Sequence, residues 1–417
     1  MQIQMRVLIR GLFIMSFLAG TLWSQTTAQE LAKRGFILTT SGDQDGTIRD
    51  LVRPGDAGSN PEALVMRGVA FADKGDQERA LQDFSEAIRL RPDSPAAFYH
   101  RALSYVMKGD YDRAVQDYTE TIRLTPNDAT AFNNRAMTYL HKHDYDKALL
   151  DFKEAIRLDP KDVRLLINRG HEYHSMRKYD LAVQDYNAAL RIKPDYGPAF
   201  SARGFAHAQN SEWDMAIKDY TESLRLEPND IDVLYHRGEA YWQAKDYVHA
   251  IQDFTAAIDL RPDVADLFYQ RGRAHLAQDA KGIDPAIADF SEAIRLKPGY
   301  VDALHNRGSA YFIKSDYDRA VDDFTECIRL VPGNATLLNE RAKAYSNKHD
   351  YDHAIQDTTE AIRLQPANAE NFFIRAISYY HKGDFENAKR DLKQAAKVDP
   401  SLTEKTQQML KSLELKK

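Results

Sequence analysis

The residues of this 417-residue sequence that come closest to a catalytic or metal-ligating pattern are histidines. The segment His171-Glu172-Tyr173-His174 differs from the zinc-binding motif H-E-x-x-H, because its second histidine comes one residue too early. The single cysteine, Cys327, excludes an internal disulfide and any zinc site built from cysteines. The sequence contains neither a nucleophile elbow nor a phosphate-binding loop. These patterns predict a protein that is not an enzyme and that has no cofactor and no resident metal.

Composition and charge narrow the class of protein further. Hydrophobic residues make up 43% of the chain and charged residues 28%, which is typical of an ordered protein. The formal net charge is -6, so the chain has no overall basic field that would attract nucleic acid. We therefore expect no nucleic-acid partner.

Residues 1–28 have the layout of a secretory signal peptide. Arg6 and Arg10 precede an uncharged apolar stretch at 11–23, and small or polar residues continue to Ala28. We expect cleavage after Ala28 and a periplasmic or secreted location in a bacterium, with an uncleaved membrane anchor as the alternative. No later apolar run approaches the ~20 residues of a membrane span, so we expect no span after cleavage. Residues 29–58 have no sustained pattern and are expected to form a flexible leader.

Prolines divide the rest of the chain at a fixed period. They stand 34 residues apart, except for one interval of 36, at positions 92, 126, 160, 194, 228, 262, 298, 332, 366 and 400. This period predicts tandem repeats instead of globular domains. The expected units are 59–92, 93–126, 127–160, 161–194, 195–228, 229–262, 263–298, 299–332, 333–366 and 367–400. Residues 401–417 are expected to form a capping helix that covers the last unit.

Each repeat is expected to contain two helices. We number the positions so that the proline is position 32 and the first repeat begins at Pro61. Large and small residues at positions 4, 8 and 11 share one helical face, and positions 20, 24 and 27 (Ala, usually aromatic, small) share another. The turn between the helices, as in 108–112, offers Asp112 as the expected N-cap of the second helix. The proline ends that helix, because it forces the preceding residue out of the helical region.

This pattern resembles the tetratricopeptide repeat, whose 34-residue signature is a large residue followed by L-G, Y, A-x3-F and P. In the second repeat the matching residues are Phe98, Ala102, Tyr105, Ala114, Tyr118 and Pro126. The resemblance implies an all-α fold, a right-handed α-solenoid (superhelix) of ten helix-turn-helix units plus a C-terminal capping helix. It also implies that the first helices line the concave side.

The chain departs uniformly from the signature at two positions. Position 7 is arginine and position 23 is aspartate in every repeat. We expect these residues to form structural ion pairs between the two helices, with the arginine stem packed against the core. A ladder of arginines that binds phosphate is the alternative. The pairs expected in the second, third and fourth repeats are Arg101 with Asp117, Arg135 with Asp151 and Arg169 with Asp185.

The resemblance implies that a partner contacts the concave wall, which is built from positions 2, 5, 6, 9, 12 and 13. Side-chain amides on this wall can bind a peptide backbone, and tyrosine or tryptophan adds apolar contact. The candidate peptide-binding residues are Tyr99, His100, Asn133, Asn134, Asn168, His171, Tyr235, His236, Trp242, Tyr269, Gln270, Arg273, His305, Asn306 and Asn339. An ordinary hydrated surface without a binding role is the alternative. Acidic residues outnumber basic ones on this wall, which favours neutral or basic segments of a partner protein or peptide.

These observations predict a non-catalytic scaffold or adaptor of the bacterial envelope or secreted fraction that binds extended peptide segments. One alternative is a regulatory or substrate-recruiting subunit of an envelope enzyme complex. A metal-binding solenoid is the other, since His171 and His174 are helical neighbours.

Overall fold

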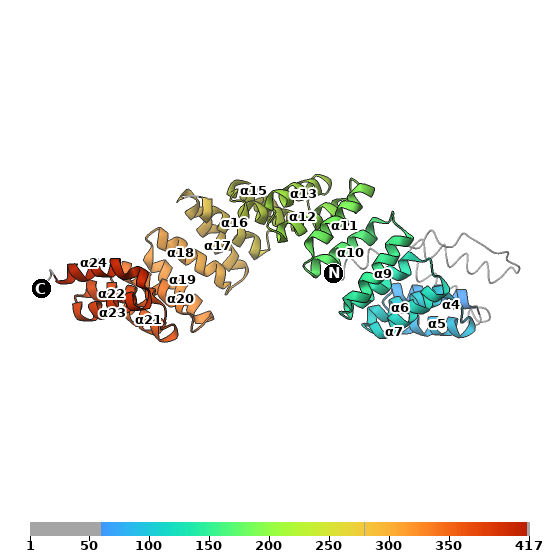
Figure 1. Cartoon of the computed structure of the whole chain (residues 1–417), viewed down its shortest axis with the longest axis horizontal. Coiled ribbons are helices and arrows are strands. Elements are labelled where there is room, and N and C mark those ends of the chain that lie inside the picture. Colours follow the sequence, from blue (N-terminus) through green and yellow to red (C-terminus); the bar gives the residue numbers. More distant parts are fainter. Residues whose placement is uncertain (1–59, 279, 415–417) are drawn as a thin grey trace. The chain divides into compact units, whose positions relative to one another are not determined.

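The computed structural model describes residues 60–278 and 280–414, which form helices joined by short turns (Figure 1). The expected signal peptide (1–28) and leader (29–58) lie outside the described residues, as do the last three residues of the expected capping segment. The chain divides into two compact units, residues 1–172 and 173–417, here called unit 1 and unit 2. The division falls within one helix, α10 (Val163–Ser175).

The helices alternate along the chain as first and second helices of successive repeats. The first helices are α4 (Pro61–Asp73), α6 (Pro95–Lys108), α8 (Ala129–His141), α10 (Val163–Ser175), α12 (Gly197–Gln209), α14 (Ile231–Gln243), α16 (Ala265–Gln278), α18 (Val301–Ile313), α20 (Ala335–Asn347) and α22 (Ala369–Lys382). The second helices are α5 (Gln77–Leu90), α7 (Tyr111–Leu124), α9 (Tyr145–Leu158), α11 (Tyr179–Ile192), α13 (Trp213–Leu226), α15 (Tyr247–Leu260), α17 (Ile283–Leu296), α19 (Tyr317–Leu330), α21 (Tyr351–Leu364) and α23 (Phe385–Val398). Two short 3₁₀ turns, η1 (Ala280–Gly282) and η2 (Pro400–Leu402), and a last helix, α24 (Thr403–Glu414), complete the described chain.

An aspartate caps the start of many second helices. In α7 this residue is Asp110, whose carboxylate accepts a hydrogen bond from the backbone N–H of Arg113 at 3.2 Å. The expectation that Asp112 is the cap is therefore wrong. Asp112 lies inside the first turn of α7, and its carboxylate instead forms an ion pair with Lys142 of the next repeat. An acidic side chain there also interacts favourably with the positive end of the helix.

The core of each repeat depends on small residues that face a buried ring. In the sixth repeat Phe254 is 1% exposed and Ala250 is fully buried on α15. A Cβ atom added to Gly238 of α14 would lie 2.8 Å from the Phe254 ring, closer than ordinary packing allows. Position 8 is therefore restricted to small residues because the aromatic ring of position 24 occupies the space above it.

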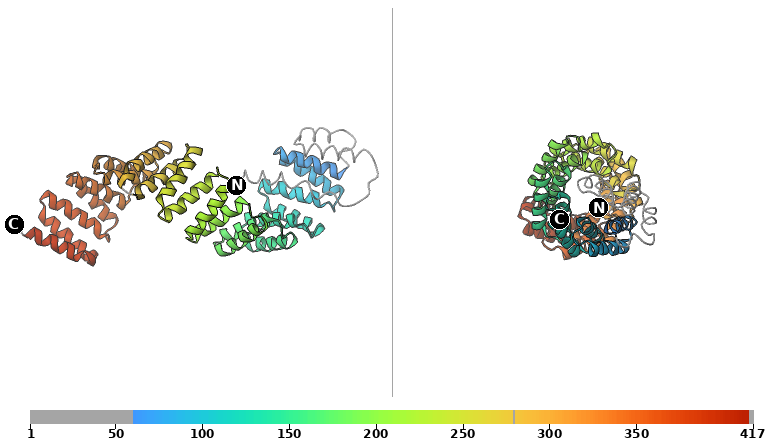
Figure 2. Two further views of the ribbon diagram at one scale, coloured as in Figure 1. Left: turned by 90° about the horizontal axis from the view of Figure 1, so that it is seen from above. Right: turned by 90° about the vertical axis from the view of Figure 1, so that its right-hand side faces the viewer.

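Consecutive helices pack against each other within each unit, as Figure 2 shows for the rows of helix pairs. First helices also contact one another directly: α4 contacts α6 in unit 1, and α12, α14, α16 and α18 form a continuous series in unit 2. We call the surface made by the first helices of each unit its inner wall. Within the described residues, no helix is both long and apolar enough to cross a membrane.

The last helix covers the end of the stack. Met409 and Leu410 of α24 pack against the buried cluster of Ala376, Ala388 and Leu392 in the tenth repeat. The apolar face that another repeat would otherwise cover is therefore shielded by α24, as a terminal cap requires.

Candidate functional site

The arginine at position 7 joins three helices. In the second repeat, Arg101 of α6 donates from Nε and Nη2 to the Asp117 carboxylate of α7 at 2.7 and 2.8 Å. Its Nη1 donates to the hydroxyl of Ser85 on α5 of the preceding repeat at 3.2 Å. Both charges are largely buried, with side-chain exposures of 20% for Arg101 and 7% for Asp117. All three guanidinium nitrogens thus donate to acceptors within the repeats, so no adjacent pair of them is left to bind a phosphate group.

The same arrangement recurs along both units. Further pairs join Arg67 to Asp83, Arg135 to Asp151, Arg203 to Asp219, Arg237 to Asp253, Arg271 to Asp289, Arg307 to Asp323, Arg341 to Asp357 and Arg375 to Asp391. The expected partners Arg169 and Asp185 belong to different units. The sequence analysis did not predict the hydrogen bond from the position-7 arginine to the preceding repeat. A signal for it exists, because position 25 is Ser, Thr or Asn in most repeats. Thr119 at this position, for example, accepts a hydrogen bond from Arg135 at 3.1 Å.

On the inner wall of unit 1, four of the expected peptide-binding residues bind one another. Asn168 donates from Nδ2 to Asn133 at 2.9 Å, Asn133 donates to Asn134 at 3.1 Å, and Asn134 donates to the Tyr99 hydroxyl at 2.8 Å. Burial raises the pKa of Tyr99 to about 12, so this hydroxyl stays protonated near neutral pH. The series fixes the orientation of each amide across three repeats, and each amide keeps further donor or acceptor capacity.

The two expected histidines of unit 1 lie in different environments. His100 stacks on Phe84 with ring centroids 5.9 Å apart and meets the edge of Tyr99 at 5.2 Å. Burial lowers the pKa of His100 to about 4, so it is neutral near pH 7. His171 is exposed. Only His171 is therefore openly accessible from the solvent.

On the inner wall of unit 2, a hydrogen bond and a cation–π contact connect α14 to α16. Gln270, which is 8% exposed, donates from Nε2 to the Tyr235 hydroxyl at 2.9 Å. Its Oε1 accepts from Nη1 of Arg273 at 2.7 Å. The Arg273 guanidinium lies over the Trp242 ring, 4.2 Å from the centroid, and 5.8 Å from the Tyr269 centroid. These five residues, all expected from the sequence, form one cluster, which we call the Arg273 cluster.

The remaining candidates of unit 2 are placed differently. His236 and His305 are half-buried next to the rings of Phe205 and Phe324, respectively. Asn306 donates from Nδ2 to the backbone oxygen of Asp302 at 2.8 Å. Asn339 is only 4% exposed, because its amide donates to the buried Asn371 of α22. The structure thus places Asn339 between two first helices and not on the open wall.

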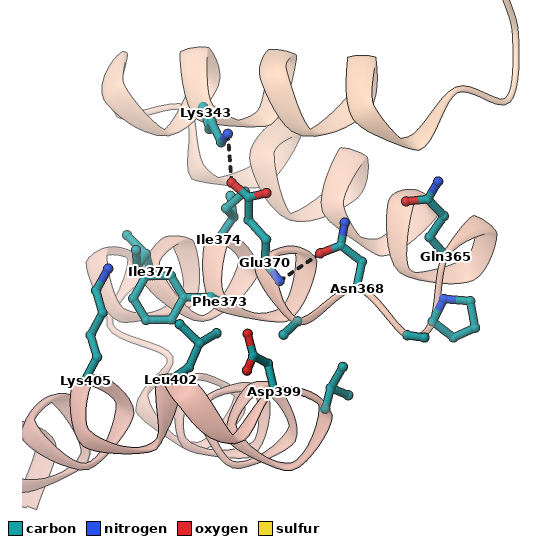
Figure 3. A pocket seen from close by; sticks show the side chains of 14 residues that line it. Lys343, Gln365, Asn368, Glu370, Phe373, Ile374, Ile377, Asp399, Leu402 and Lys405 are labelled. Atoms are coloured by element: carbon teal, nitrogen blue, oxygen red, sulfur yellow. Dashed lines mark hydrogen bonds and ion pairs between the residues drawn. The ribbon is translucent and has the colours of Figure 1, made fainter.

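A groove lies on the inner wall at the C-terminal end of unit 2, with a volume of about 1000 Å³ (Figure 3). Phe373, Ile374 and Ile377 of α22 and Leu402 of η2 supply apolar surface. Lys405 of α24 lies over the Phe373 ring, 4.4 Å from its centroid. The capping segment therefore forms part of a groove as well as covering the core.

Charged side chains line the opposite side of the groove. Lys343 of α20 lies 2.9 Å from a carboxylate oxygen of Glu370 and 3.5 Å from one of Glu340. Burial lowers the pKa of Lys343, but the hydrogen bond to Glu370 and the charge of Glu340 outweigh this effect and raise it overall. The positive charge at this edge is thus neutralised by neighbours within the protein.

Sequence reasoning did not select the groove residues as candidates. The signal was present, since positions 5, 6 and 9 of the tenth repeat are all apolar (Phe373, Ile374 and Ile377), whereas most other repeats carry at least one polar side chain at these positions. The contribution of Leu402 and Lys405 could not be found from the period, because both residues lie beyond the last proline.

No group of three or more histidine, cysteine or acidic residues with a metal-binding arrangement occurs in residues 60–278 and 280–414. Cys327 is buried, and burial raises the pKa of its thiol to about 12, which leaves it protonated and unreactive near neutral pH.

Solved structures of repeat proteins resemble this chain. A tetratricopeptide repeat protein from Parabacteroides merdae is 21% identical, covers 60% of this chain and 98% of its own, and has a TM-score of 0.45. The protein YrrB, whose structure is described as having an unusual peptide-binding site, is 22% identical over 45% of this chain and 95% of its own, with a TM-score of 0.41. The MamA protein is 24% identical over 42% of this chain and 94% of its own, with a TM-score of 0.39. A comparison with curated proteins finds no match.

Family models match almost the whole repeat region. Models described as tetratricopeptide repeat match residues 95–128, 129–162, 163–196, 201–265, 269–335 and 339–401, and one described as TPR repeat matches 68–109. Together these matches cover well over half of the chain, and the paired helices and small-large packing of the structure agree with them. The chain belongs to the tetratricopeptide repeat family.

Proposed function

We propose that this protein is a non-catalytic scaffold that binds extended segments of partner proteins on the inner walls of its two units. The observation that carries this proposal is that the invariant charged side chains serve the framework, whereas the variable side chains lie on the inner walls. The arginine and aspartate of positions 7 and 23 repeat without change and are occupied by the framework, as Arg101 and Asp117 illustrate. The inner-wall positions vary from repeat to repeat and keep unused hydrogen-bonding capacity.

The series Asn168–Asn133–Asn134–Tyr99 is suited to a peptide backbone. Its amides are held in place by one another, so little side-chain freedom remains to be lost when a ligand binds. An oriented amide can donate to a backbone carbonyl and accept from a backbone N–H without selecting a particular side chain. In unit 2 the groove of Phe373, Ile374 and Leu402 can take an apolar side chain of the same kind of segment.

Charge on the wall favours neutral or basic partner segments. Asp232 and Asp302 are exposed at position 2 of their repeats in unit 2, and Glu239 is half-buried at position 9. Such a surface attracts basic segments and repels nucleic acid. The proposal includes a periplasmic or secreted location, because residues 1–28 have the layout of a secretory signal peptide.

A pull-down from the exported fraction tests the proposal. The full chain is compared with a triple variant, Asn134→Ala, Asn168→Ala and Asn306→Ala, on the inner walls. A matched control variant changes the exposed outer pair Glu86 and Arg89 to alanine. We expect partner capture to be lost in the inner-wall variant and retained in the control. Equal capture by the two variants would move the binding site away from the inner walls.

A further inference from the structure

In most repeats the outer surface of the second helix carries an ion pair. Position 26 is glutamate and position 29 is arginine in seven of the ten repeats. The two side chains pair in each of these repeats: Glu86 with Arg89, Glu120 with Arg123, Glu154 with Arg157, Glu222 with Arg225, Glu292 with Arg295, Glu326 with Arg329 and Glu360 with Arg363. The glutamate also lies one helical turn before the apolar residue at position 30 and covers part of it. These repeats therefore present a neutral, hydrated outer surface.

Repeats four and six lack this ion pair. Position 26 is alanine in both, as Ala188 on α11 and Ala256 on α15. The residues at position 30, Ile192 and Leu260, are 41% and 40% exposed, whereas the equivalent residues of the other eight repeats are half-buried. The short side chain of alanine thus leaves the apolar residue of the next turn open to the solvent.

The same change leaves two opposite charges unpaired. Arg191 of α11 and Asp259 of α15 both occupy position 29, and neither forms an ion pair in the part of the chain that the structure describes. Every repeat except the sixth carries Arg or Lys at this position. A carboxylate in the last turn of a helix is unfavourable, because the C-terminal end of the helix is itself negative. Arg261, close by in the sequence, is already paired with Asp263.

Further apolar side chains are exposed on the same helices. Leu181 of α11, Met215 of α13 and Val248 of α15 are exposed near the helix starts, where most other repeats carry an acidic and a basic residue. The three helices are successive second helices of unit 2 (Figure 1). We call the surface that they form the outer face of unit 2, and it is defined by Leu181, Ala188, Arg191, Ile192, Met215, Val248, Ala256, Asp259 and Leu260.

The charges of this face are complementary to those of a second copy. A twofold axis that runs along α13 brings α11 of each copy against α15 of the other, so that equal positions of the repeats meet. Arg191 of each copy then faces Asp259 of the other, and both unpaired charges are neutralised at two symmetry-related places. The arginine also offsets the unfavourable carboxylate at the end of α15.

The apolar side chains match in the same arrangement. Ile192 meets Leu260 next to the charged pair, and the alanines of position 26 allow the helices to approach closely. Leu181 meets Val248 at the other end of the helices, and Met215 lies on the axis. A partner with charge of one sign, such as a nucleic acid or an anionic membrane surface, would be repelled at one side of the face. The pattern therefore favours a second copy of this chain as the occupant.

We infer that this protein forms a symmetric dimer through the outer face of unit 2. The inference goes beyond the proposed function, because the contact uses second helices and leaves the inner walls of both copies for partner segments. Such a dimer presents every inner-wall site twice, so a partner with repeated segments is bound more tightly than by one copy.

Exchanging the two charges tests the inference. Analytical ultracentrifugation of the full chain, at concentrations up to roughly 100 µM, measures the mass of the wild type, Arg191→Asp, Asp259→Arg and the variant with both changes. An equimolar mixture of the two single variants is measured in the same way. The control is Arg363→Asp, which makes the same change at position 29 of the ninth repeat. Circular dichroism melting of every variant establishes that it is folded.

We expect the wild type and the control to reach twice the monomer mass as the concentration rises. Each single variant places like charges opposite each other at both contacts, so its dimer is weakened about tenfold or more. The variant with both changes dimerises again, because arginine and aspartate have only changed places. The mixture of single variants forms mixed dimers, since one chain then carries both acids of the face and the other carries both arginines.

Restoring the ion pair of the other repeats gives an independent check. Ala188→Glu supplies Arg191 with a partner on its own helix, as Glu154 does for Arg157, and it covers Ile192. We expect this variant to lose the dimer and to keep its melting temperature. A wild type that stays monomeric at the highest concentration would overturn the inference. A dimer that the single charge changes leave intact, or an assembly that grows beyond two copies, would overturn it as well, because association would then use another surface.

Discussion

A position-7 arginine whose aspartate lies in the same unit is largely buried together with it, so the loss of one partner leaves an uncompensated charge. In the third repeat, Arg135 donates to Asp151 at 2.7 and 2.8 Å, and the side chains are 16% and 9% exposed. A buried pair of this kind adds little stability over an apolar pair, yet breaking it is costly. The pair therefore acts mainly to fix how the two helices of a repeat meet.

A double-mutant cycle on this pair measures that effect. We expect Asp151→Ala and Arg135→Leu each to lower the free energy of unfolding by about 3 kcal/mol. The double variant should lose clearly less than the sum, because neither charge is then left alone. Urea unfolding followed by circular dichroism provides the measurement, with the exposed Arg157→Leu as a control that should change nothing measurable. Strictly additive losses would argue against coupling between the two side chains.

His100 makes the stability of unit 1 depend on pH. Its pKa falls from 6.5 in the unfolded chain to about 4 in the folded protein because of burial. Between these values the unfolded chain binds the proton more tightly, so the contribution of His100 is complete above pH 6.5 and is lost as the pH falls. Between pH 7.5 and pH 4.5 we expect a loss of about 2 kcal/mol from this group. His100→Leu should reduce the pH dependence by that amount, and an unchanged pH profile would contradict the assignment.

At the scale of the element, the turns between paired helices have the same backbone shape but different residues. Gly109 has φ 77° and Gly383 has φ 85°, whereas Lys245 and Ser315 occupy the equivalent position with φ of 62° and 61°. Only glycine adopts this left-handed conformation without a steric penalty. The non-glycine turns are therefore sites at which stability can still be gained.

We expect Lys245→Gly to raise the free energy of unfolding by about 0.5–1 kcal/mol, since it removes that steric penalty. Lys245 is exposed, so the substitution removes little packing. Gly109→Ala is the matched reverse change and should lower stability by a similar amount. Thermal melting of both variants gives the measurement. Shifts of the same sign in the two variants would show that backbone strain does not control these turns.

Local sequence predicted the helices better than it predicted their ends. The period and the small-large alternation indicated two helices per repeat, because packing requires both features. The N-cap was misplaced because Asp110 and Asp112 both flank Tyr111, and either is chemically able to cap a helix. Only the structure shows that the Asp110 carboxylate accepts a hydrogen bond from the backbone N–H of Arg113, whereas Asp112 forms an ion pair with Lys142.

At the scale of the whole molecule, the repeat period was enough to predict the fold class but not the details of the inner wall. The register placed Asn134, Gln270 and Arg273 on the first helices, but it could not show which amides bind each other across repeats. It also could not show that Asn339 is buried against Asn371, because a side chain of ordinary polarity is compatible with either environment. Contacts between repeats depend on rotamers, and the period contains no information about these.

The repeat architecture predicts how far along the chain a destabilising core substitution acts. Each helix pair contacts its neighbours along the chain, so stability is expected to be a sum of local and nearest-neighbour contributions. Ala136→Leu overfills the fully buried position beside Phe152 in unit 1, and Ala376→Leu does the same beside Leu392 in unit 2. We expect amide hydrogen exchange to accelerate around α6–α9 in the first variant and around α20–α23 in the second. If each variant instead accelerated exchange equally in both regions, the chain would unfold as a single cooperative body, and the nearest-neighbour description would fail.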